Sequence, residues 1–393
     1  MTAPATARLP QAHEGHRVLQ LSKYYPPVDG GIEVIAFELA QGLRAAGVPT
    51  DVLCNGTSRR TVREQEAGGD VVRAGTLGTV LSTSMSPALV VEALRMRSRH
   101  DVIHLHAPNP MAALALWIAR PRARIVVHWH SDVIRQRRAM RLFGPLQDWL
   151  LREASAVIVT SERYFSHSPW LRPYADKVRV VPLGIDAERG RPDPEEVARV
   201  SQALRVRYGG RPIVFSLGRI VAYKGFAGLI EAALRLREPA LVVVGGSGEL
   251  LDEHRRRVRE ERLDDRIRFV GRLTRIETEA HLAIAQAYCL PSITRAEAFG
   301  IAMLEAMARG LPVVATRIEG SGVPWVNQHG VTGLNVEVGD AAAMAGALDA
   351  LVADPARARD MGEAARRRYV ECFTADRMVA ATLALYRELG LAA

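Results

Sequence analysis

The chain has few cysteines, few aromatic residues and no motif typical of nucleic-acid recognition. Its three cysteines, Cys54, Cys289 and Cys372, are scattered along 393 residues. They are too few and too far apart for a disulfide framework or a zinc motif, which suits a reducing compartment. Aromatic residues make up only 6% of the chain, and there is no zinc finger, RNP-like aromatic pattern or basic arm. These absences argue against a nucleic-acid-binding protein.

Long apolar runs are also missing. A helix that crosses a bilayer needs about 18 to 20 apolar residues in a row, and the nearest candidate, residues 111–119, is far shorter. The segment up to Arg17 is polar and rich in alanine and proline, without the apolar core of an export signal. We therefore expect a protein that is soluble or lies on a surface and, together with the basic segment described next, one that is cytoplasmic and peripheral on the inner face of the cell membrane.

Positive charge is in excess, with a formal net charge of +9. A polyanionic partner is indicated, either a phosphorylated small molecule or a membrane face. Within residues 134–151, arginines stand beside Trp149 and other large apolar residues, and such a segment can lie on an anionic lipid surface. The alternative is a core helix with a solvated basic face. The arginines concerned are Arg135, Arg137, Arg138 and Arg141.

Short β-like runs alternate with helical stretches along the whole chain, which predicts parallel sheets covered on both faces. Hydrophobic residues make up 48% of the sequence, enough for two domains with real cores. The predicted strands are 18–21, 50–54, 71–73, 102–106, 124–128, 156–160 and 178–182 in the first half, and 212–217, 240–244, 267–270, 287–290 and 312–315 in the second.

The segment 186–194 is rich in proline, glycine and charge, and we interpret it as a linker. We therefore predict an α/β protein with two Rossmann-like, doubly wound domains, residues 1–186 and 187–375. Residues 376–393 are predicted to form a C-terminal helix that packs back toward the first domain. In such folds ligands bind outside the carboxyl ends of the strands, which predicts a cleft between the domains.

The most informative motif is residues 297–305, which places two carboxylates around the start of a helix. Gly300 stands where the chain turns into that helix, so the N–H groups of Gly300, Ile301 and Ala302 are suited to an anion. Glu297 precedes the helix and Glu305 lies on its second turn. A diphosphate at the helix end would have one carboxylate near each of its ends, which fits a nucleotide-sugar. The alternative is an ordinary amphipathic helix with solvated glutamates.

Two cations and two glycine turns belong to the same prediction. Arg219 and Lys224 lie in a loop after a strand and would neutralise a leaving diphosphate; alone, they are equally typical of solvated loop charges. Gly31 follows the first strand and opens a helix, so it would let a phosphate approach the backbone. The turn at 245–249 fails as a nicotinamide-binding fingerprint, because no acidic residue closes a second strand about 20 residues later.

Four histidines alternate near two strand ends, His104 and His106 on one and His128 and His130 on the other. They could face one point as metal ligands do. Histidines on strands are more often satisfied by backbone or carboxylate groups, however, and no ligating acid is spaced with these. No Asp-x-Asp follows an apolar strand either. We therefore predict no metal site and no cofactor, and we expect His130 to reach the cleft.

Taken in order, these motifs resemble the retaining glycosyltransferases of family 4, a large GT-B group that includes bacterial mannosyltransferases. The resemblance covers nearly the whole chain. It is carried by residues 24–27, 30–33, 130–132, 181–186, 218–220, 224–225, 269–273, 291–292 and 297–305. The departures are few: Ala222 and Tyr223 stand where a more polar residue often precedes the lysine, and the basic stretch 294–296 precedes Glu297, which leaves the donor sugar open.

The resemblance implies a role for each matching residue. Glu297 and His130 would contact the sugar, with Arg219 and Lys224 on the diphosphate and Glu305 on the ribose. The remaining donor-binding residues would be Gly31 at the distal phosphate, Gly271, Arg272 and Leu273 along the base, and the backbone of Phe299, Gly300 and Ile301 at the sugar and phosphate.

The implied activity is transfer of a hexose, with mannose from GDP-mannose as the preferred donor, to a lipid-linked or oligosaccharide acceptor in cell-surface polysaccharide synthesis. The anomeric configuration would be retained, and no metal would be required. Two alternatives remain: a UDP-hexose donor, and a GT-B hydrolase or epimerase of nucleotide-sugars. The implied partners are the donor, the acceptor and an anionic membrane surface.

Overall fold

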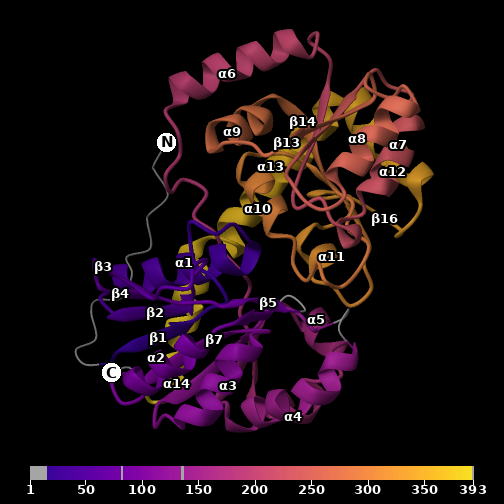
Figure 1. The fold of residues 1–393 in the computed structure, drawn as a ribbon. Helices are drawn as coiled ribbons and strands as arrows, with labels where there is room; N and C mark the ends of the chain where they lie inside the picture. Colours follow the sequence, from indigo (N-terminus) through magenta and orange to yellow (C-terminus); the bar gives the residue numbers. More distant parts are fainter. Residues whose placement is uncertain (1–15, 81–82, 134–136, 392–393) are drawn as a thin grey trace. The chain divides into compact units, whose positions relative to one another are not determined.

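The computed structural model describes residues 16–80, 83–133 and 137–391, with the side chains of 137–140 and 142 outside that description. Two compact units make up the chain. The first comprises Met1–Ile185 together with Thr374–Ala393, and the second comprises Asp186–Phe373. Each unit is built on a largely parallel sheet with helices on its faces (Figure 1). The predicted α/β class with two doubly wound sheets is therefore confirmed.

The first unit contains an eight-stranded sheet whose strand order is β10-β9-β8-β7-β1-β2-β4-β3. All neighbours pair in parallel except β3 and β4, which form an antiparallel edge that the sequence did not predict. The central strands are fully buried, as apolar runs covered on both faces must be, whereas β3 is exposed. The strands are β1 (Val18–Leu21), β2 (Thr50–Asn55), β3 (Val62–Glu66), β4 (Gly69–Ala74), β7 (Val102–Ala107), β8 (Arg124–Trp129), β9 (Ala156–Val159) and β10 (Val178–Val180).

Helices of the first unit start at sequence signals that are easy to read. The side chains of Ser86 and Asn109 cap α2 and α3, and each helix has proline at its first position. The helices are α1 (Gly31–Ala45), α2 (Pro87–Met96), α3 (Pro110–Ala119), α4 (Arg137–Glu153), α5 (Glu162–Ser166), the 3₁₀ turn η1 (Arg172–Lys177) and α14 (Ala375–Glu388). A separate hairpin joins β5 (Gly78–Val80) to β6 (Thr83–Met85).

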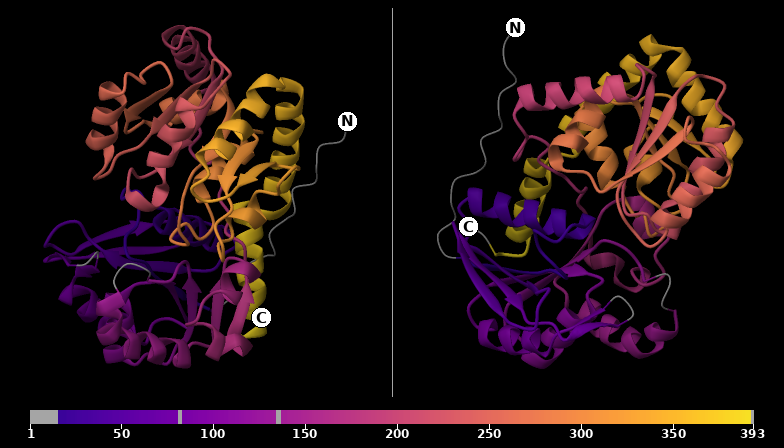
Figure 2. Two further views of the ribbon diagram at one scale, coloured as in Figure 1. Left: turned by 90° about the vertical axis from the view of Figure 1, so that its right-hand side faces the viewer. Right: turned by 45° about the horizontal axis from the view of Figure 1, so that its top comes forward.

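The last helix belongs to the first unit although it lies at the far end of the chain. In Figures 1 and 2, α14 (yellow) runs beside α1 (indigo). A single β-bridge joins Ile185 to Thr374, where the chain leaves this unit and later returns to it.

The second unit contains a six-stranded parallel sheet in the order β13-β12-β11-β14-β15-β16. Its strands are β11 (Ile213–Leu217), β12 (Leu241–Gly245), β13 (Ile267–Gly271), β14 (Ala285–Leu290), β15 (Val313–Thr316) and β16 (Gly333–Val336). Its helices are α6 (Pro194–Arg207), η2 (Ala222–Lys224), α7 (Phe226–Leu234), α8 (Leu251–Glu260), α9 (Arg275–Ile284), α10 (Ile301–Ala308), α11 (Val323–Val326), α12 (Ala341–Ala353) and α13 (Pro355–Cys372).

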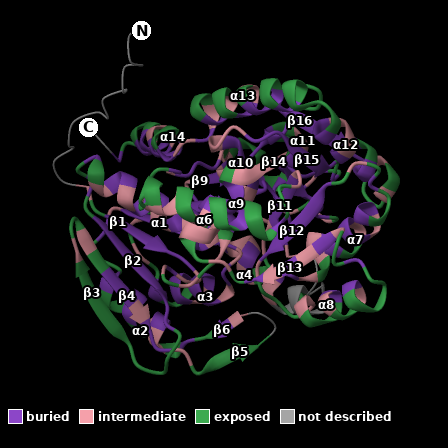
Figure 3. Cartoon of the chain, turned by 90° about the horizontal axis from the view of Figure 1, so that it is seen from above, coloured by how far each residue is buried: buried purple, intermediate pink, exposed green. Residues whose placement is uncertain are grey.

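Burial follows the same layers in both units. Strands such as β1 and β12 are buried, and the outer faces of helices such as α13 are exposed (Figure 3). The core of the second unit contains Val214, Val242, Val244 and Leu348, all fully enclosed. Within the described ranges, none of the helices is both long enough and apolar enough to cross a bilayer.

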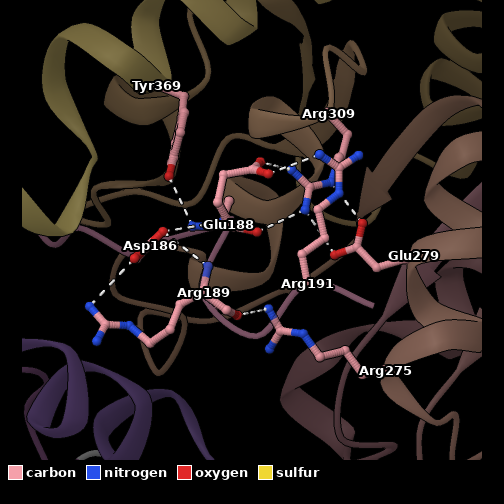
Figure 4. Close-up of polar contacts among 9 residues, drawn as sticks. Asp186, Glu188, Arg189, Arg191, Arg275, Glu279, Arg309 and Tyr369 are labelled. Carbon is pink, nitrogen blue, oxygen red and sulfur yellow. Dashed lines mark hydrogen bonds and ion pairs between the residues drawn. The ribbon is translucent and has the colours of Figure 1, made fainter. Parts of the chain in front are cut away.

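The start of the predicted linker is fixed to the second unit by hydrogen bonds and ion pairs (Figure 4). Arg309, just after α10, donates to the carbonyl oxygen of Ala187 at 2.8 Å and pairs with Glu188 at 2.6 Å. The N–H of Ala187 donates to the Tyr369 hydroxyl at 3.2 Å, and Arg275 donates to the carbonyl oxygen of Arg189. Arg309 therefore joins the helix that carries Glu305 to the first residues of this unit.

Candidate active site

Several of the predicted site residues lie where each sheet reverses its strand order. In an open parallel sheet, the loops diverge at this switch point and leave room for a ligand at the carboxyl ends of the strands. The switch lies between β1 and β7 in the first unit and between β11 and β14 in the second. Gly31 follows β1 at the first switch, and Arg219 and Glu297 follow β11 and β14 at the second. His130 follows β8 and residues 271–273 lie at the end of β13, so these lie away from the switch points.

Lys224 and Glu297 form a buried ion pair in the second unit. Lys224 Nζ lies 2.6 Å from Glu297 Oε2, and their side chains are only 12% and 10% exposed. Burial alone disfavours the charged form of Lys224, but the Glu297 carboxylate outweighs this effect and raises the pKa of the lysine. The Ser292 hydroxyl donates to the same Oε2 at 2.8 Å. One oxygen of Glu297 is thus occupied from two sides.

The loop that carries Lys224 is attached to the segment after β14 at Gly225. This residue has φ 73°, and a Cβ atom there would lie 2.0 Å from the carbonyl oxygen of Pro291. Only glycine permits that approach. The N–H of Ile293 also donates to the carbonyl oxygen of Tyr223 at 2.8 Å. The close contact brings Lys224 to Ser292 and Glu297 although they lie far away in the sequence.

Arg219, the other predicted cation, is exposed at the end of β11. Its guanidinium contacts the Tyr223 hydroxyl at 3.4 Å, and the N–H of Ile220 donates to the carbonyl oxygen of Ser247 at 2.8 Å. The glycine turn 245–249 has a structural role here. At Gly246 a Cβ atom would lie 1.9 Å from the carbonyl oxygen of Gly218, so glycine lets the two strand ends touch.

The helix α10 starts after Gly300, and its first N–H groups have no partner within the helix. Phe299 is buried against Trp325 and Phe373, at centroid distances of 6.2 and 5.7 Å, which fixes the entry into the helix. Glu305 lies on the second turn, partly exposed. Burial raises its pKa to about 7, more than Arg275 and Arg309 lower it. Burial thus favours the protonated form of this carboxyl group.

The remaining donor-binding candidates of the second unit lie after β13. Gly271 ends that strand with φ 86°, and its carbonyl oxygen accepts from the N–H of Gly246 at 2.7 Å. Arg272 is exposed and Leu273 is partly buried next to Gly245. The strands β11, β12, β13 and β14 are all parallel. The residues after β13 therefore leave the sheet at the same edge as the loops after β11 and β14.

In the first unit, Gly31 is the first residue of α1, as predicted from its position after β1. The start of this helix already has an acidic neighbour. A Cβ atom on Gly30 would lie 2.1 Å from Glu33 Oε2, so the carboxylate of Glu33 lies against the helix entrance. A carboxylate is stabilised at that position by the N-terminal dipole of the helix.

The four histidines of the first unit do gather on one face of the sheet, with His106 and His128 paired in register. Among the described residues they bond neither to backbone nor to carboxylates, contrary to the expectation from the sequence. His104 bonds to the Tyr386 hydroxyl at 2.7 Å and to His128 at 3.2 Å. His106 bonds to His130 at 2.8 Å and to Gln20 at 2.6 Å.

This histidine cluster is electrically neutral. Burial, followed by repulsion from neighbouring imidazoles, lowers the pKa of His104, His106 and His130 well below the ordinary value of histidine. Burial alone lowers the pKa of His128 to about 3. His104, His106 and His128 also offer nitrogen atoms within 4.8 Å of one another, close enough to be considered as metal ligands.

Asp132 anchors the loop behind His130, a role that the sequence did not reveal. Its Oδ1 accepts from the Trp129 indole at 2.9 Å and from the Ser168 hydroxyl at 2.8 Å, and its N–H donates to the Tyr164 hydroxyl at 2.6 Å. These four residues fix the backbone on both sides of His130. The spacing of His130 and Asp132 can be seen in the sequence, but the partners of Asp132 cannot.

The predicted membrane segment is only partly described. Arg135 lies outside the described residues, as do the side chains of Arg137 and Arg138. Arg141 is exposed on α4. The guanidinium of Arg120 lies over the rings of both Trp149 and Trp117, at 5.1 and 5.7 Å, and Trp117 is 46% exposed. Arg120 and two tryptophans thus lie together where α3 and α4 pack against each other.

Comparison with known proteins agrees with this architecture. The family model "Glycosyl transferases group 1" matches residues 202–368, and "Glycosyl transferase 4-like domain" matches residues 30–184. Among solved structures, the chain resembles sucrose-phosphate synthase from Thermosynechococcus elongatus with a TM-score of 0.78 and 24% identity, over 95% of this chain and 99% of that one. This likeness shows the GT-B fold.

Curated relatives match over nearly their full length. The chain is 32% identical to O-antigen chain mannosyltransferase C of Escherichia coli, over 95% of this chain and 98% of that protein. It is 33% identical to D-rhamnosyltransferase WbpZ of Pseudomonas aeruginosa, over 91% and 92%.

A third relative is named for its donor. This is the GDP-mannose-dependent alpha-(1-6)-phosphatidylinositol monomannoside mannosyltransferase of Mycobacterium tuberculosis, 32% identical over 89% of this chain and 92% of that protein. The predicted resemblance is confirmed: the chain belongs to the group 1 glycosyltransferases, and it is a glycosyltransferase with the GT-B fold.

Proposed function

We propose that this glycosyltransferase moves mannose from GDP-mannose to a lipid-linked or oligosaccharide acceptor with retention of the anomeric configuration. The observation that carries the proposal is the buried Lys224–Glu297 pair beside the start of α10. The donor choice is supported by two relatives named as mannosyltransferases, one of them GDP-mannose-dependent. Their names also support an acceptor that belongs to a surface polysaccharide or a glycolipid.

The cations act on the leaving group. As the bond from the sugar to the diphosphate breaks, negative charge grows on the distal phosphate and the anomeric carbon becomes oxocarbenium-like. Arg219, Lys224 and the N–H groups that start α10 stabilise that charge. We propose that this fixed positive charge replaces a divalent metal, and that the enzyme needs no cofactor.

Glu297 positions the sugar rather than attacking it. Its Oε2 accepts from both Lys224 and Ser292, which leaves Oε1 to accept from a sugar hydroxyl. A carboxylate neutralised by a buried lysine is also a weak nucleophile. Retention then follows from attack on the face from which the diphosphate departs, with the distal phosphate taking the proton of the acceptor.

The other proposed contacts follow the loops of each unit. Glu305 binds the ribose hydroxyls, residues 271–273 line the base, and Phe299, Gly300 and Ile301 present their backbone to the phosphate and sugar. In the first unit, Gly31 approaches the distal phosphate and His130 contacts the sugar.

We further propose that the enzyme is cytoplasmic and binds the inner face of the cell membrane through α3 and α4. Exposed Trp117 and partly exposed Trp149 suit the boundary between headgroups and acyl chains, while Arg120 and Arg141 suit anionic headgroups. The enzyme could then bind a lipid-linked acceptor while the lipid of the acceptor stays in the membrane.

A donor screen tests the reaction. Thermal shifts with GDP, UDP and ADP and their sugars should show stabilisation by GDP-mannose, and NMR of the product should show an α linkage. Activity should survive EDTA. Saturation by UDP-glucose alone would overturn the donor, and a β product would overturn retention. Donor breakdown at the full rate without an acceptor would show a hydrolase or an epimerase instead.

Vesicle binding tests the membrane surface. Replacing Arg135, Arg137, Arg138 and Arg141 by serine should reduce co-sedimentation with anionic vesicles, by about 1 kcal/mol for each residue near the surface. Arg256→Ser and Arg259→Ser, on α8 of the second unit, serve as matched controls and should leave binding unchanged. Equal binding by the parent and the fourfold variant would show that the segment is a structural helix with no role in membrane binding.

A further inference from the structure

A chain of three buried side chains leads from β1 to His130. Gln20, His106 and His130 are at most 5% exposed, and they lie on adjacent strands or directly after one. The Gln20 carbonyl oxygen Oε1 lies 2.6 Å from His106 Nε2, and His106 Nδ1 lies 2.8 Å from His130 Nε2. Both distances are those of good hydrogen bonds.

The Gln20 amide turns its oxygen toward His106, while its Nε2 has no hydrogen-bond partner among the described residues, and this orientation sets the direction of both hydrogen bonds. A carbonyl oxygen only accepts, so His106 Nε2 carries the proton of this bond. His106 is buried and neutral, so its Nδ1 is bare and must accept in turn. His130 Nε2 is then the donor, and a neutral His130 is left with a bare Nδ1. The sequence Gln20, His106, His130 therefore specifies one of the two tautomers of His130.

His130 Nδ1 is the end of the chain. It makes no hydrogen bond within the part of the chain that the structure describes, and it is not among the fully enclosed unpaired atoms there. A bare imidazole nitrogen accepts a hydrogen bond from a hydroxyl group. Because the ring is neutral, it also adds no positive charge beside a sugar that becomes oxocarbenium-like.

We propose that Gln20 and His106 are positioning residues that hold His130 as the Nε2–H tautomer, so that its bare Nδ1 accepts a hydrogen bond from a hydroxyl of the transferred sugar. This inference rests on the proposed function for the identity of the ligand. The tautomer itself follows from the two hydrogen bonds together with the neutral form that burial favours for both imidazoles.

A metal ion is the competing explanation of the cluster. His104, His106 and His128 are close enough for one. The nitrogens that face one another are already bonded, however, His104 Nε2 with His128 Nδ1 and both nitrogens of His106 with Gln20 and His130. A metal held by the facing nitrogens of His104 and His106 would require these two rings to abandon their bonds for nitrogen–metal distances of about 2.0 to 2.1 Å, whereas His128 Nε2 has no hydrogen-bond partner among the described residues. The observed contacts favour the hydrogen-bonded chain.

Imidazole ¹⁵N NMR of the purified full chain reports the tautomer without any substrate. We expect the His130 signals, assigned by their loss in His130→Gln, to show a protonated Nε2 and a bare Nδ1 at neutral pH. An Nδ1–H tautomer or an imidazolium at His130 overturns the proposal. Stoichiometric zinc in the purified protein, with a spectrum that changes on chelation, overturns it in favour of a metal site.

Variants separate positioning from structure. Gln20→Met removes the acceptor at similar size, and it should mix the two tautomers of His130. Tyr386→Phe is the matched control, since it removes a buried hydroxyl from the His104 half of the same cluster, and it should leave His130 unchanged. The wild-type spectrum decides the tautomer even where a variant does not fold.

Kinetics connect the tautomer to the sugar. Gln20→Met should lower kcat/KM for the intact donor about five- to tenfold, the loss of roughly one hydrogen bond, and leave the Kd of the free nucleoside diphosphate unchanged. With donors that lack one ring hydroxyl each, the loss should vanish for one of them. An equal loss with every such donor would assign Gln20 a structural role only. Since the NMR result needs no donor, failure of the proposed function is distinguishable from failure of this inference.

Discussion

The two switch points of this enzyme use opposite chemistry. In the first unit, the buried polar side chains that meet across β1, β7 and β8 are an amide and four histidines whose pKa values burial lowers. In the second, the loops after β11 and β14 are charged, with Lys224 paired to Glu297 and Arg219 beside them.

Under the proposed function, this difference would match the two halves of an activated sugar. Neutral donors and acceptors recognise hydroxyl groups, and fixed cations recognise a diphosphate. Under the proposed function one type of fold would serve two tasks, because the residues at the strand ends differ while both sheets share a parallel switch point.

Among changes at the charged switch point, we expect substitution of Lys224 to cause the largest loss of stability and activity. Lys224→Met leaves Glu297 buried without its partner, which should cost about 3 to 5 kcal/mol of unfolding free energy and about a thousandfold in kcat. The double variant Lys224→Met/Glu297→Gln should recover most of the stability in urea unfolding but none of the rate. Arg235→Ala, which alters an exposed pair on α7, is the control. Recovered activity in the double variant would contradict a role of Lys224 at the leaving group.

The first unit, which contains the buried histidines, should lose stability in acid. Below pH 6.5 the unfolded chain protonates its histidines while the buried ones stay neutral, so unfolding free energy falls as pH drops. Each buried histidine should contribute about 1.4 kcal/mol per pH unit. Hydrogen exchange in β7 and β8, corrected for the intrinsic rate, should therefore accelerate more on acidification than exchange in β11 and β14. The second unit has only His254 and His281 with lowered pKa values. Equal acceleration of hydrogen exchange in the two sheets would contradict a special acid sensitivity of the first unit.

Arg309 tests how far the second unit depends on its ion pairs. Arg309→Ala leaves Glu279, whose side chain is 11% exposed, without its partner at 2.7 Å. It also frees the segment at Ala187, and we expect a loss of about 3 kcal/mol in chemical unfolding. Arg317→Ala, which breaks the exposed pair with Glu337, should cost less than about 1 kcal/mol. Similar losses from both variants would mean that the anchor adds nothing beyond a surface contact.

The pH dependence of nucleotide affinity tests the role of Glu305 in the charged switch point of the second unit. The pKa of Glu305 is raised to about 7, so the carboxylate that would accept from ribose hydroxyls is lost as pH falls below 7. Calorimetric affinity for the nucleoside diphosphate should then fall by up to about tenfold per pH unit. The Glu305→Gln variant keeps only the slope due to the phosphate of the nucleotide. Identical slopes for the two proteins would exclude Glu305 from ribose binding.

Much of the fold was predictable because its signals are local. Every strand predicted from an apolar run is present, since buried parallel strands must be apolar along their whole length. The strands that were missed are β3, β5, β6 and β16, which are exposed, very short or preceded by glycine turns. The layout of Glu297, Gly300 and Glu305 was readable for the same reason, because one helix start sets the spacing of all three.

By itself, the sequence determined the two α/β units, the family and the types of residue at the strand ends. Only the tertiary structure decided which of these residues meet. Lys224 and Glu297 are 73 positions apart, and Gln20 and His106 are 86 apart. They come together because β11 lies beside β14 and β1 beside β7. Strand order depends on how whole elements pack, and no local pattern of residues encodes it.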